Sequence, residues 1–185
     1  MRRPSPSSNG VQVYTRSAVF LHWSMALALL GNFLLGVTMS DLPLSPQKLQ
    51  FYSWHKWAGI TLLALVTLRL IWRGINRPPE LLPAPLWQQR TANITHVLLY
   101  GLMFAIPLSG WLMSSAAGFT VNYLGILPLP DLVDKNKALF EWLKDTHEVL
   151  NFTLLGVVAL HALAALKHHF IDRDASLHRM LTWRK

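Results

Sequence analysis

Four long apolar windows limit what this chain can fold into. They cover residues 17–39, 53–72, 92–116 and 144–170, and each is long enough to cross a bilayer with almost no charge in its interior. A chain that crosses lipid has to satisfy its backbone amides and carbonyls internally, which leaves α-helices as the open-chain solution. We therefore predict an all-α fold, a four-helix transmembrane bundle with these windows as its spans.

The composition excludes several classes of protein. Of the 185 residues, 52% are hydrophobic and 14% are charged, against about 25% charged in an ordinary soluble domain. The net charge of +8 comes from basic residues that flank the spans, so no nucleic-acid partner is predicted. The chain has no cysteine, which excludes disulfides, thiolate metal sites, iron–sulfur clusters and cysteine-linked haem. Any redox cofactor therefore needs nitrogen or oxygen ligands.

The basic residues predict the orientation of the chain. All ten arginines lie on the side that holds the two termini, with Arg69 just inside the membrane on that side. The positive-inside rule then places both termini in the cytoplasm. The opposite side holds only lysines as basic residues, namely Lys48, Lys56, Lys135, Lys137 and Lys144.

The segments outside the spans are short. We expect a disordered tail over residues 1–13, one four-span domain over 14–172 and a basic cytoplasmic tail over 173–185. The inner loop, residues 74–90, is rich in proline and is predicted to be extended. The outer loop, residues 118–143, is expected to contain a short interfacial helix. Glycines inside the spans let a helix or a flat ligand approach closely, and they are Gly31, Gly36, Gly59, Gly101, Gly110 and Gly156.

Two histidines of the fourth window give the strongest functional signal. His147 and His161 are fourteen residues apart, which on an α-helix is about 21 Å and about 40° short of four turns. The two imidazoles therefore share one face, with one near each membrane surface. Because polar groups within spans usually face the bundle and serve a function, this register predicts two sites stacked across the membrane.

Each of these sites has a partner histidine at matching depth. His55 enters the membrane from the outside, as His147 does, and His22 lies at about the level of His161. Paired imidazoles without cysteine suit b-type haem iron. A four-histidine zinc or copper centre is the other metal interpretation, but a separation of about 21 Å is too great for one compact site. The interpretation without a metal is a set of hydrogen-bonded histidines at the membrane interface.

Several stretches support the haem interpretation by resemblance. They are FLHW around His22, WHKWAGI around His55, THVLLYGLMFAIPLSGWLMSS in the third span, and LKDTHEVL and ALHALAALKHHFIDRDASLHRM in and after the fourth. Over residues 14–180 the chain resembles the bacterial cytochrome b561 family, small four-span di-haem proteins of the inner membrane. The resemblance implies two haem b groups, with His22, His55, His147 and His161 as the axial iron ligands.

The resemblance also implies an electron-transfer function. The best-understood type is a superoxide oxidase, in which superoxide gives an electron to the outer haem, and the electron crosses to the inner haem and reduces ubiquinone. Related proteins are non-enzymatic electron-carrier subunits for a dehydrogenase or hydrogenase, so the outer donor is superoxide or a redox protein. A transporter or metal-handling bundle is a third alternative, against which the shortage of ionisable residues in mid-membrane argues. The predicted partners are membrane lipid, a quinone and this outer donor.

The inner end of the fourth span offers candidates for quinone chemistry. His168 follows His161 by seven residues, so it lies on nearly the same face, about 10.5 Å further toward the inner surface. Its imidazole is suited to give a hydrogen bond or a proton to a quinone carbonyl next to the inner haem. Lys167 is a weaker candidate of the same kind. The alternative for both is a side chain that snorkels to the interface.

Two further residues reach the depth of the inner haem. Arg69 is fourteen residues after His55 and shares its helix face. A buried arginine needs an anion, and a haem propionate is a suitable one. His96, near the inner end of the third span, is a rival ligand for the inner haem. Because two imidazoles already complete the iron, we interpret His96 as structural or as a propionate contact.

Overall fold

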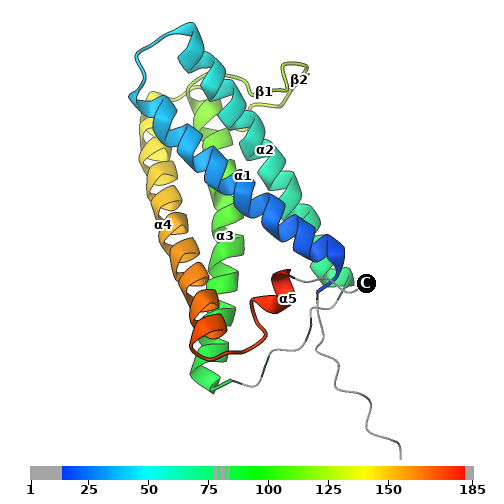
Figure 1. Ribbon diagram of the computed structural model, residues 1–185. Coiled ribbons are helices and arrows are strands. Elements are labelled where there is room, and N and C mark those ends of the chain that lie inside the picture. Colours follow the sequence, from blue (N-terminus) through cyan, green and yellow to red (C-terminus); the bar gives the residue numbers. More distant parts are fainter. Residues whose placement is uncertain (1–13, 77–78, 80–81, 83, 182–185) are drawn as a thin grey trace, which may run out of the picture.

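The computed structural model describes residues 14–76, 79, 82 and 84–181. Within these residues the chain forms four long helices, which are α1 (Arg16–Asp41), α2 (Pro46–Ile75), α3 (Leu86–Ala116) and α4 (Lys137–Phe170). All four are long and apolar enough to cross a membrane. The predicted all-α, four-helix transmembrane fold is therefore confirmed (Figure 1).

Side-chain caps decide where three of the helices begin. Thr15, Ser45 and Asn136 each accept a hydrogen bond from the backbone N–H three residues later, at 3.3, 3.2 and 3.0 Å. The cap at Asn136 starts α4 seven residues before the expected span window. The charged stretch expected to contain a separate interfacial helix is instead the first part of α4, so that expectation was wrong.

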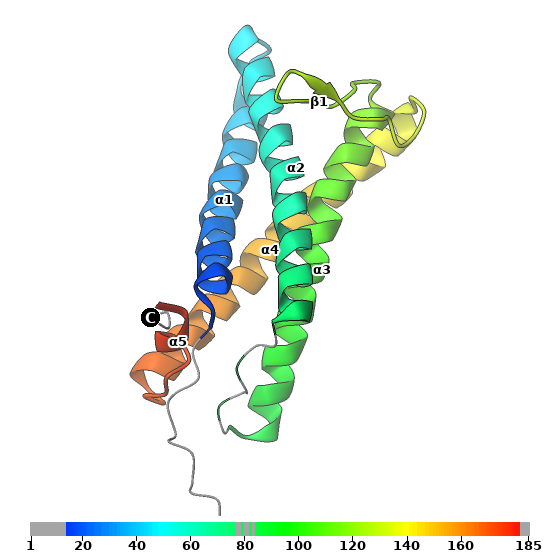
Figure 2. The same ribbon diagram turned by 90° about the vertical axis from the view of Figure 1, so that its right-hand side faces the viewer.

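The helices pack as neighbours in sequence. The closest helix–helix contacts join α1 with α2, α2 with α3 and α3 with α4, and Figure 2 shows the α1–α2 pair crossing the α3–α4 pair. Helix α4 has only two buried residues within the described chain, Leu143 and Leu154. Its large apolar side chains, such as Leu160 at 67% exposed, face outward. Such a surface is suited to lipid rather than to water.

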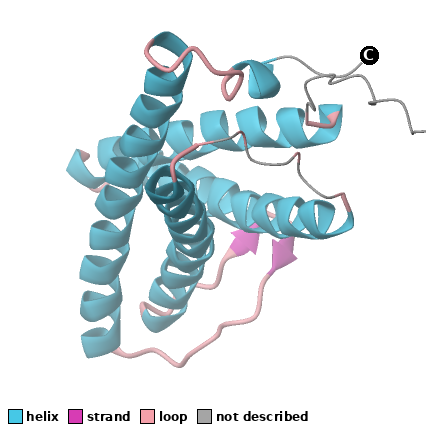
Figure 3. Ribbon diagram, turned by 90° about the horizontal axis from the view of Figure 1, so that it is seen from below, coloured by secondary structure: helices cyan, strands magenta, loops and turns pink. Residues whose placement is uncertain are grey.

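A short β-hairpin covers one end of the bundle (Figure 3). Strands β1 (Asn122–Tyr123) and β2 (Leu127–Pro128) pair antiparallel. The turn between them places Leu124 at φ 54° and Gly125 at φ 75°. The Trp57 indole of α2 donates a hydrogen bond of 2.6 Å to the Asn122 carbonyl, which ties the hairpin to the bundle.

The C-terminal segment covers part of the opposite end. After α4 the chain turns at Arg173, with φ 53°, and forms the single-turn helix α5 (His178–Leu181). The Trp23 indole of α1 donates a hydrogen bond of 2.9 Å to the Met180 carbonyl. This contact joins the beginning and the end of the described chain. The expected tail at residues 1–13 lies outside the described residues, as do parts of the inner loop and of the basic tail, namely residues 77–78, 80–81, 83 and 182–185.

The two ends of the bundle allow a direct test of orientation. The start of α1 and the helix α5 lie at one end, and the hairpin lies at the other (Figure 1). If the arginine-rich end is cytoplasmic, green fluorescent protein fused after Lys185 should fluoresce. Alkaline phosphatase inserted at Gly125, in the hairpin turn, should be active because that enzyme needs the oxidising outer compartment. The opposite pair of results would invert the predicted topology.

Candidate functional site

The outer histidine pair joins α2 to α4. The ring centroids of His55 and His147 are 6.2 Å apart, and the ring planes are 81° apart. Both residues are half-buried within the bundle. The structure therefore brings together the two histidines that the sequence places at the outer depth.

The inner histidine pair joins α1 to α4. The ring centroids of His22 and His161 are 6.3 Å apart, with an angle of 67° between the planes. The ring of His96, on α3, lies 5.6 Å from that of His161. Three imidazoles from three helices therefore meet at the inner depth.

The separations of the two pairs fit an iron atom between the rings. Two iron–nitrogen bonds of about 2 Å, plus about 1.1 Å from each nitrogen to its own ring centroid, would place the centroids of two imidazoles that hold one iron about 6.2 Å apart. The observed 6.2 and 6.3 Å match this value. The distance of 5.6 Å between His96 and His161 is shorter. The His22 ring therefore lies at the separation expected for a ligand pair with His161, and the His96 ring lies closer.

Neither histidine pair lies where two helices pack closely. Each pair joins α4 to α1 or α2, and neither combination belongs to the closely packed helix pairs of the described chain. Helices that pack directly have axes about 8–10 Å apart, which leaves no space for a macrocycle. Side chains, rather than close backbone contacts, therefore span the distance from α4 to α1 and α2.

Glycines let the outer rings approach the backbone. A Cβ atom added at Gly36 would lie 3.0 Å from Cε1 of His55, and one at Gly110 would lie 3.1 Å from Cε1 of His147. The other four glycines of the spans have open space around them in the described structure. At Gly36 and Gly110 a side chain of another helix therefore makes the close approach predicted for span glycines.

Hydrogen bonds orient the two outer imidazoles. Nδ1 of His55 lies 3.1 Å from the backbone carbonyl of Asn32, and Nδ1 of His147 lies 2.9 Å from Oγ of Ser109. A carbonyl only accepts, so the proton of His55 is on Nδ1 and its Nε2 lone pair is free for a metal. The amide oxygen Oδ1 of Asn32 is itself buried without a hydrogen-bond partner. An incomplete polar environment of this kind is expected where a further group binds.

Arg69 lies beside the inner pair, as expected. It is half-buried, and its guanidinium donates to the hydroxyl of Tyr100 at 3.1 Å and to the carbonyl of Ala18 at 3.0 Å. A third contact, of 3.4 Å, reaches Nδ1 of His22. Within the described residues no carboxylate pairs with Arg69, so its positive charge is available to an anion at the inner pair.

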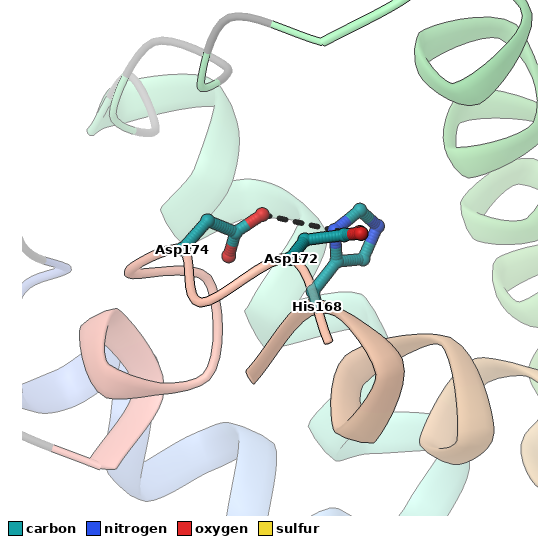
Figure 4. Close-up of side chains that lie close together, drawn as sticks. All are labelled: His168, Asp172 and Asp174. Atoms are coloured by element: carbon teal, nitrogen blue, oxygen red, sulfur yellow. Dashed lines mark ion pairs between the residues drawn. The ribbon is translucent and has the colours of Figure 1, made fainter. Parts of the chain in front are cut away.

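A charged cluster follows the end of α4 (Figure 4). Nδ1 of His168 lies 3.0 Å from Asp172 and 2.9 Å from Asp174, and Nζ of Lys167 lies 2.6 Å from Asp172. Partial burial alone would raise the pKa of the Asp174 carboxyl. Hydrogen bonds from Ser176 and the adjacent His168 imidazole outweigh this and hold that pKa below its ordinary value. The two carboxylates thus place negative charge beside the His168 imidazole at the end of α4.

Comparison with known proteins assigns the family. Residues 13–183 match the family model described as prokaryotic cytochrome b561. Over 173 residues the chain is 35% identical to Cytochrome b561 homolog 2 of Escherichia coli K12, with 89% of this chain and 88% of that protein covered. The chain belongs to the prokaryotic cytochrome b561 family. It is also 30% identical to Cytochrome b561 homolog 1 of the same organism, over 93% of this chain and 98% of that protein.

The family assignment gives the cofactor class and the broad function. The family binds b-type haem, so this chain is a multi-pass membrane haem protein of electron transfer. Imidazole nitrogens in a cysteine-free chain are the expected donors for such a haem. A third relative, named Probable superoxide oxidase CybB, of Yersinia pestis, is 30% identical over 128 residues, which are 69% of this chain and 72% of that protein.

Sequence reasoning missed the residues that surround the predicted ligands. They are Asn32 and Ser109 beside the outer rings, Tyr100 beside Arg69, and the carboxylates Asp172 and Asp174. The spacing of the carboxylates from His168, at four and six residues, is a local signal that could have identified them. Asn32, Ser109 and Tyr100 lie on other helices than the side chains they contact, so no sequence spacing relates them.

The glycine contacts generate a testable prediction. Gly110→Val should push the His147 ring out of place and lower the haem content of the purified protein. Gly101→Val is the matched control, because it lies on the same helix with open space around it. Pyridine haemochrome assay of both variants measures the difference. Equal haem contents would show that Gly110 does not shape the haem site.

Proposed function

We propose that this protein carries two b haems, one held by His55 and His147 and one by His22 and His161, and that it transfers electrons from superoxide on the outer side to ubiquinone on the inner side of the bacterial inner membrane. One observation carries the proposal. The two histidine pairs have ring separations of 6.2 and 6.3 Å, which suit two imidazoles that would hold one haem iron between them. When bound, haem supplies a one-electron carrier at each depth.

A lysine at the outer pair supports an anionic electron donor. Lys56 directly follows His55, is half-buried, and donates a hydrogen bond of 2.7 Å to Oγ of Ser114. In the part of the chain that the structure describes, no carboxylate pairs with this ammonium group. A partly desolvated cation attracts a small anion more strongly than an exposed one does. The name of the Yersinia pestis relative points to the same donor, superoxide.

The cluster at His168 supports reduction of a quinone at the inner side. Quinol formation consumes protons, and the His168 imidazole, which lies against Asp172 and Asp174, is placed to donate one. Lys167 pairs with Asp172. We therefore assign Lys167 to stabilising that carboxylate and not to donating a second proton. Arg69 is assigned to an anionic propionate of the inner haem.

The proposed reaction balances in electrons and protons. Two superoxide ions each lose one electron and become two molecules of dioxygen. One quinone takes up these two electrons together with two protons from the cytoplasmic side and becomes quinol. Since one donor lies outside and the protons come from inside, turnover would also move charge across the membrane.

A second candidate is a non-enzymatic electron-carrier subunit for a dehydrogenase or hydrogenase. The hairpin end favours it, because Phe119, Ile126 and Leu127 are 68%, 82% and 54% exposed. Such an apolar end suits contact with another protein. Superoxide generated in solution distinguishes the two candidates. Rapid haem reduction with no other protein present supports the oxidase, and reduction only after a partner is added supports the carrier.

The ligand assignment predicts a change in haem number. Purified wild-type protein should contain two b haems per chain, and His147→Ala should contain one, because a single remaining axial imidazole holds haem weakly. The matched variant His96→Ala should keep both haems. Reduced-minus-oxidised spectra with haem counted per chain measure this. A colourless wild type, or a His147→Ala protein with two haems, would refute the assignment.

The quinone-side assignment predicts a selective loss. His168→Gln should slow quinol formation at least tenfold, because general acid catalysis typically contributes about 10²–10⁴-fold, while superoxide still reduces the haem. His169→Gln is the control, since His169 is exposed and contacts only the ring of Phe170 among the described side chains. Stopped-flow spectroscopy separates haem reduction from quinol formation. Equal rates in the two variants would exclude His168 from the quinone step.

A further inference from the structure

Ser109 lies at the centre of a hydrogen-bonded chain behind the outer histidine pair. The residue is buried, at 6% exposed, on α3. Its Oγ donates to the carbonyl of Ile106 at 2.8 Å and lies 2.9 Å from Nδ1 of His147. The neighbouring Gly110 lets the imidazole approach this turn of α3. One helical turn therefore supplies both the space and the polar contact for His147.

The donors and acceptors in these hydrogen bonds follow from counting protons. A serine hydroxyl has one proton, and the carbonyl of Ile106 takes it because a carbonyl cannot donate. Ser109 is therefore an acceptor toward His147, and the Ile106 carbonyl, which also hydrogen-bonds the His147 imidazole, can likewise only accept. His147 thus has its proton on Nδ1. The lone pair of its Nε2 is then free for iron, as it is in His55, whose Nδ1 faces the carbonyl of Asn32.

The inner pair has a different environment. Nδ1 of His22 faces the guanidinium of Arg69 at 3.4 Å, and a guanidinium only donates. Within the described residues, Nδ1 of His161 makes no hydrogen bond with a serine or a carbonyl. Nδ1 of each outer imidazole thus faces a neutral hydrogen-bond acceptor, whereas Nδ1 of His22 faces a charged donor.

We infer that Ser109 is a positioning residue that fixes the tautomer and ring plane of His147 and lowers the reduction potential of the outer haem. An acceptor on Nδ1–H makes the imidazole a more basic ligand, which stabilises ferric over ferrous iron. A lower outer potential makes electron transfer toward the inner haem more favourable. The inference rests on the proposed function, because it takes His147 as an iron ligand.

The test is a redox titration of the holoprotein in wild type and in Ser109→Ala. Loss of the acceptor should raise the midpoint potential of one haem, the one missing from His147→Ala, and leave the other unchanged. Ser109→Thr keeps the hydroxyl and should restore the wild-type value. Ser115→Ala is the matched control, because Ser115 is a buried serine of the same helix whose described contacts are Trp111 and Leu132 rather than a histidine.

A spectroscopic readout accompanies the potentials. The ferric low-spin EPR signal of a bis-imidazole haem depends on the angle between the ring planes, which is 81° at the outer pair. Ser109→Ala removes the hydroxyl from His147 and leaves the Ile106 carbonyl as its acceptor, so the ring should reorient and change the outer signal only. A merely structural role for Ser109 would not produce a change confined to one haem.

The outcomes separate this inference from the proposed function. If His147→Ala loses one haem but Ser109→Ala leaves both potentials and the EPR signal unchanged, the inference is overturned and the ligand assignment stands. An equal shift in Ser115→Ala overturns it as well. If Ser109→Ala fails to retain the outer haem, Ser109→Cys keeps a weaker acceptor. Its outer potential should then rise, and a wild-type potential in that variant overturns the inference.

Discussion

An imidazole placed inside a bilayer needs a polar partner for each of its nitrogens, and the bundle is arranged around this need. A buried polar group left without a partner costs about 1–3 kcal/mol. His55 and His147 each have one nitrogen held by the protein, through a carbonyl and a hydroxyl. In the proposed di-haem protein, iron would be the partner of the second nitrogen of each. Cofactor binding and helix orientation are therefore parts of one polar network.

The features that depend only on position along the sequence could be predicted. The four spans follow from the lengths of the apolar windows, and α1, α2, α3 and α4 contain those windows. The register of His147 and His161 follows from the geometry of a single helix. The pairing with His55 and His22 needed only depth, because a bilayer aligns the helices along a common axis. The membrane fixes the direction and depth of each helix, which in a soluble protein would be fixed by tertiary packing.

The features that depend on how the helices rotate could not be predicted. Ser109 contacts His147, and Tyr100 contacts Arg69, only because α3 turns those side chains toward its neighbours. The hairpin was missed for a similar reason. Two strands of two residues have little stability of their own. Their place is set by contacts with α2, through Trp57 and Thr61.

The position of His147 and His161 on a single helix has a consequence for electron tunnelling. Tunnelling rates fall steeply with distance, so a pathway between two carriers is sensitive to any change in their spacing. The two residues belong to α4, one uninterrupted helix of 34 residues. In the proposed di-haem protein, α4 carries one ligand of each haem. The spacing of these two ligands is set by the rise of one hydrogen-bonded helix and not by the packing between helices, so the tunnelling distance depends little on how the other helices are arranged.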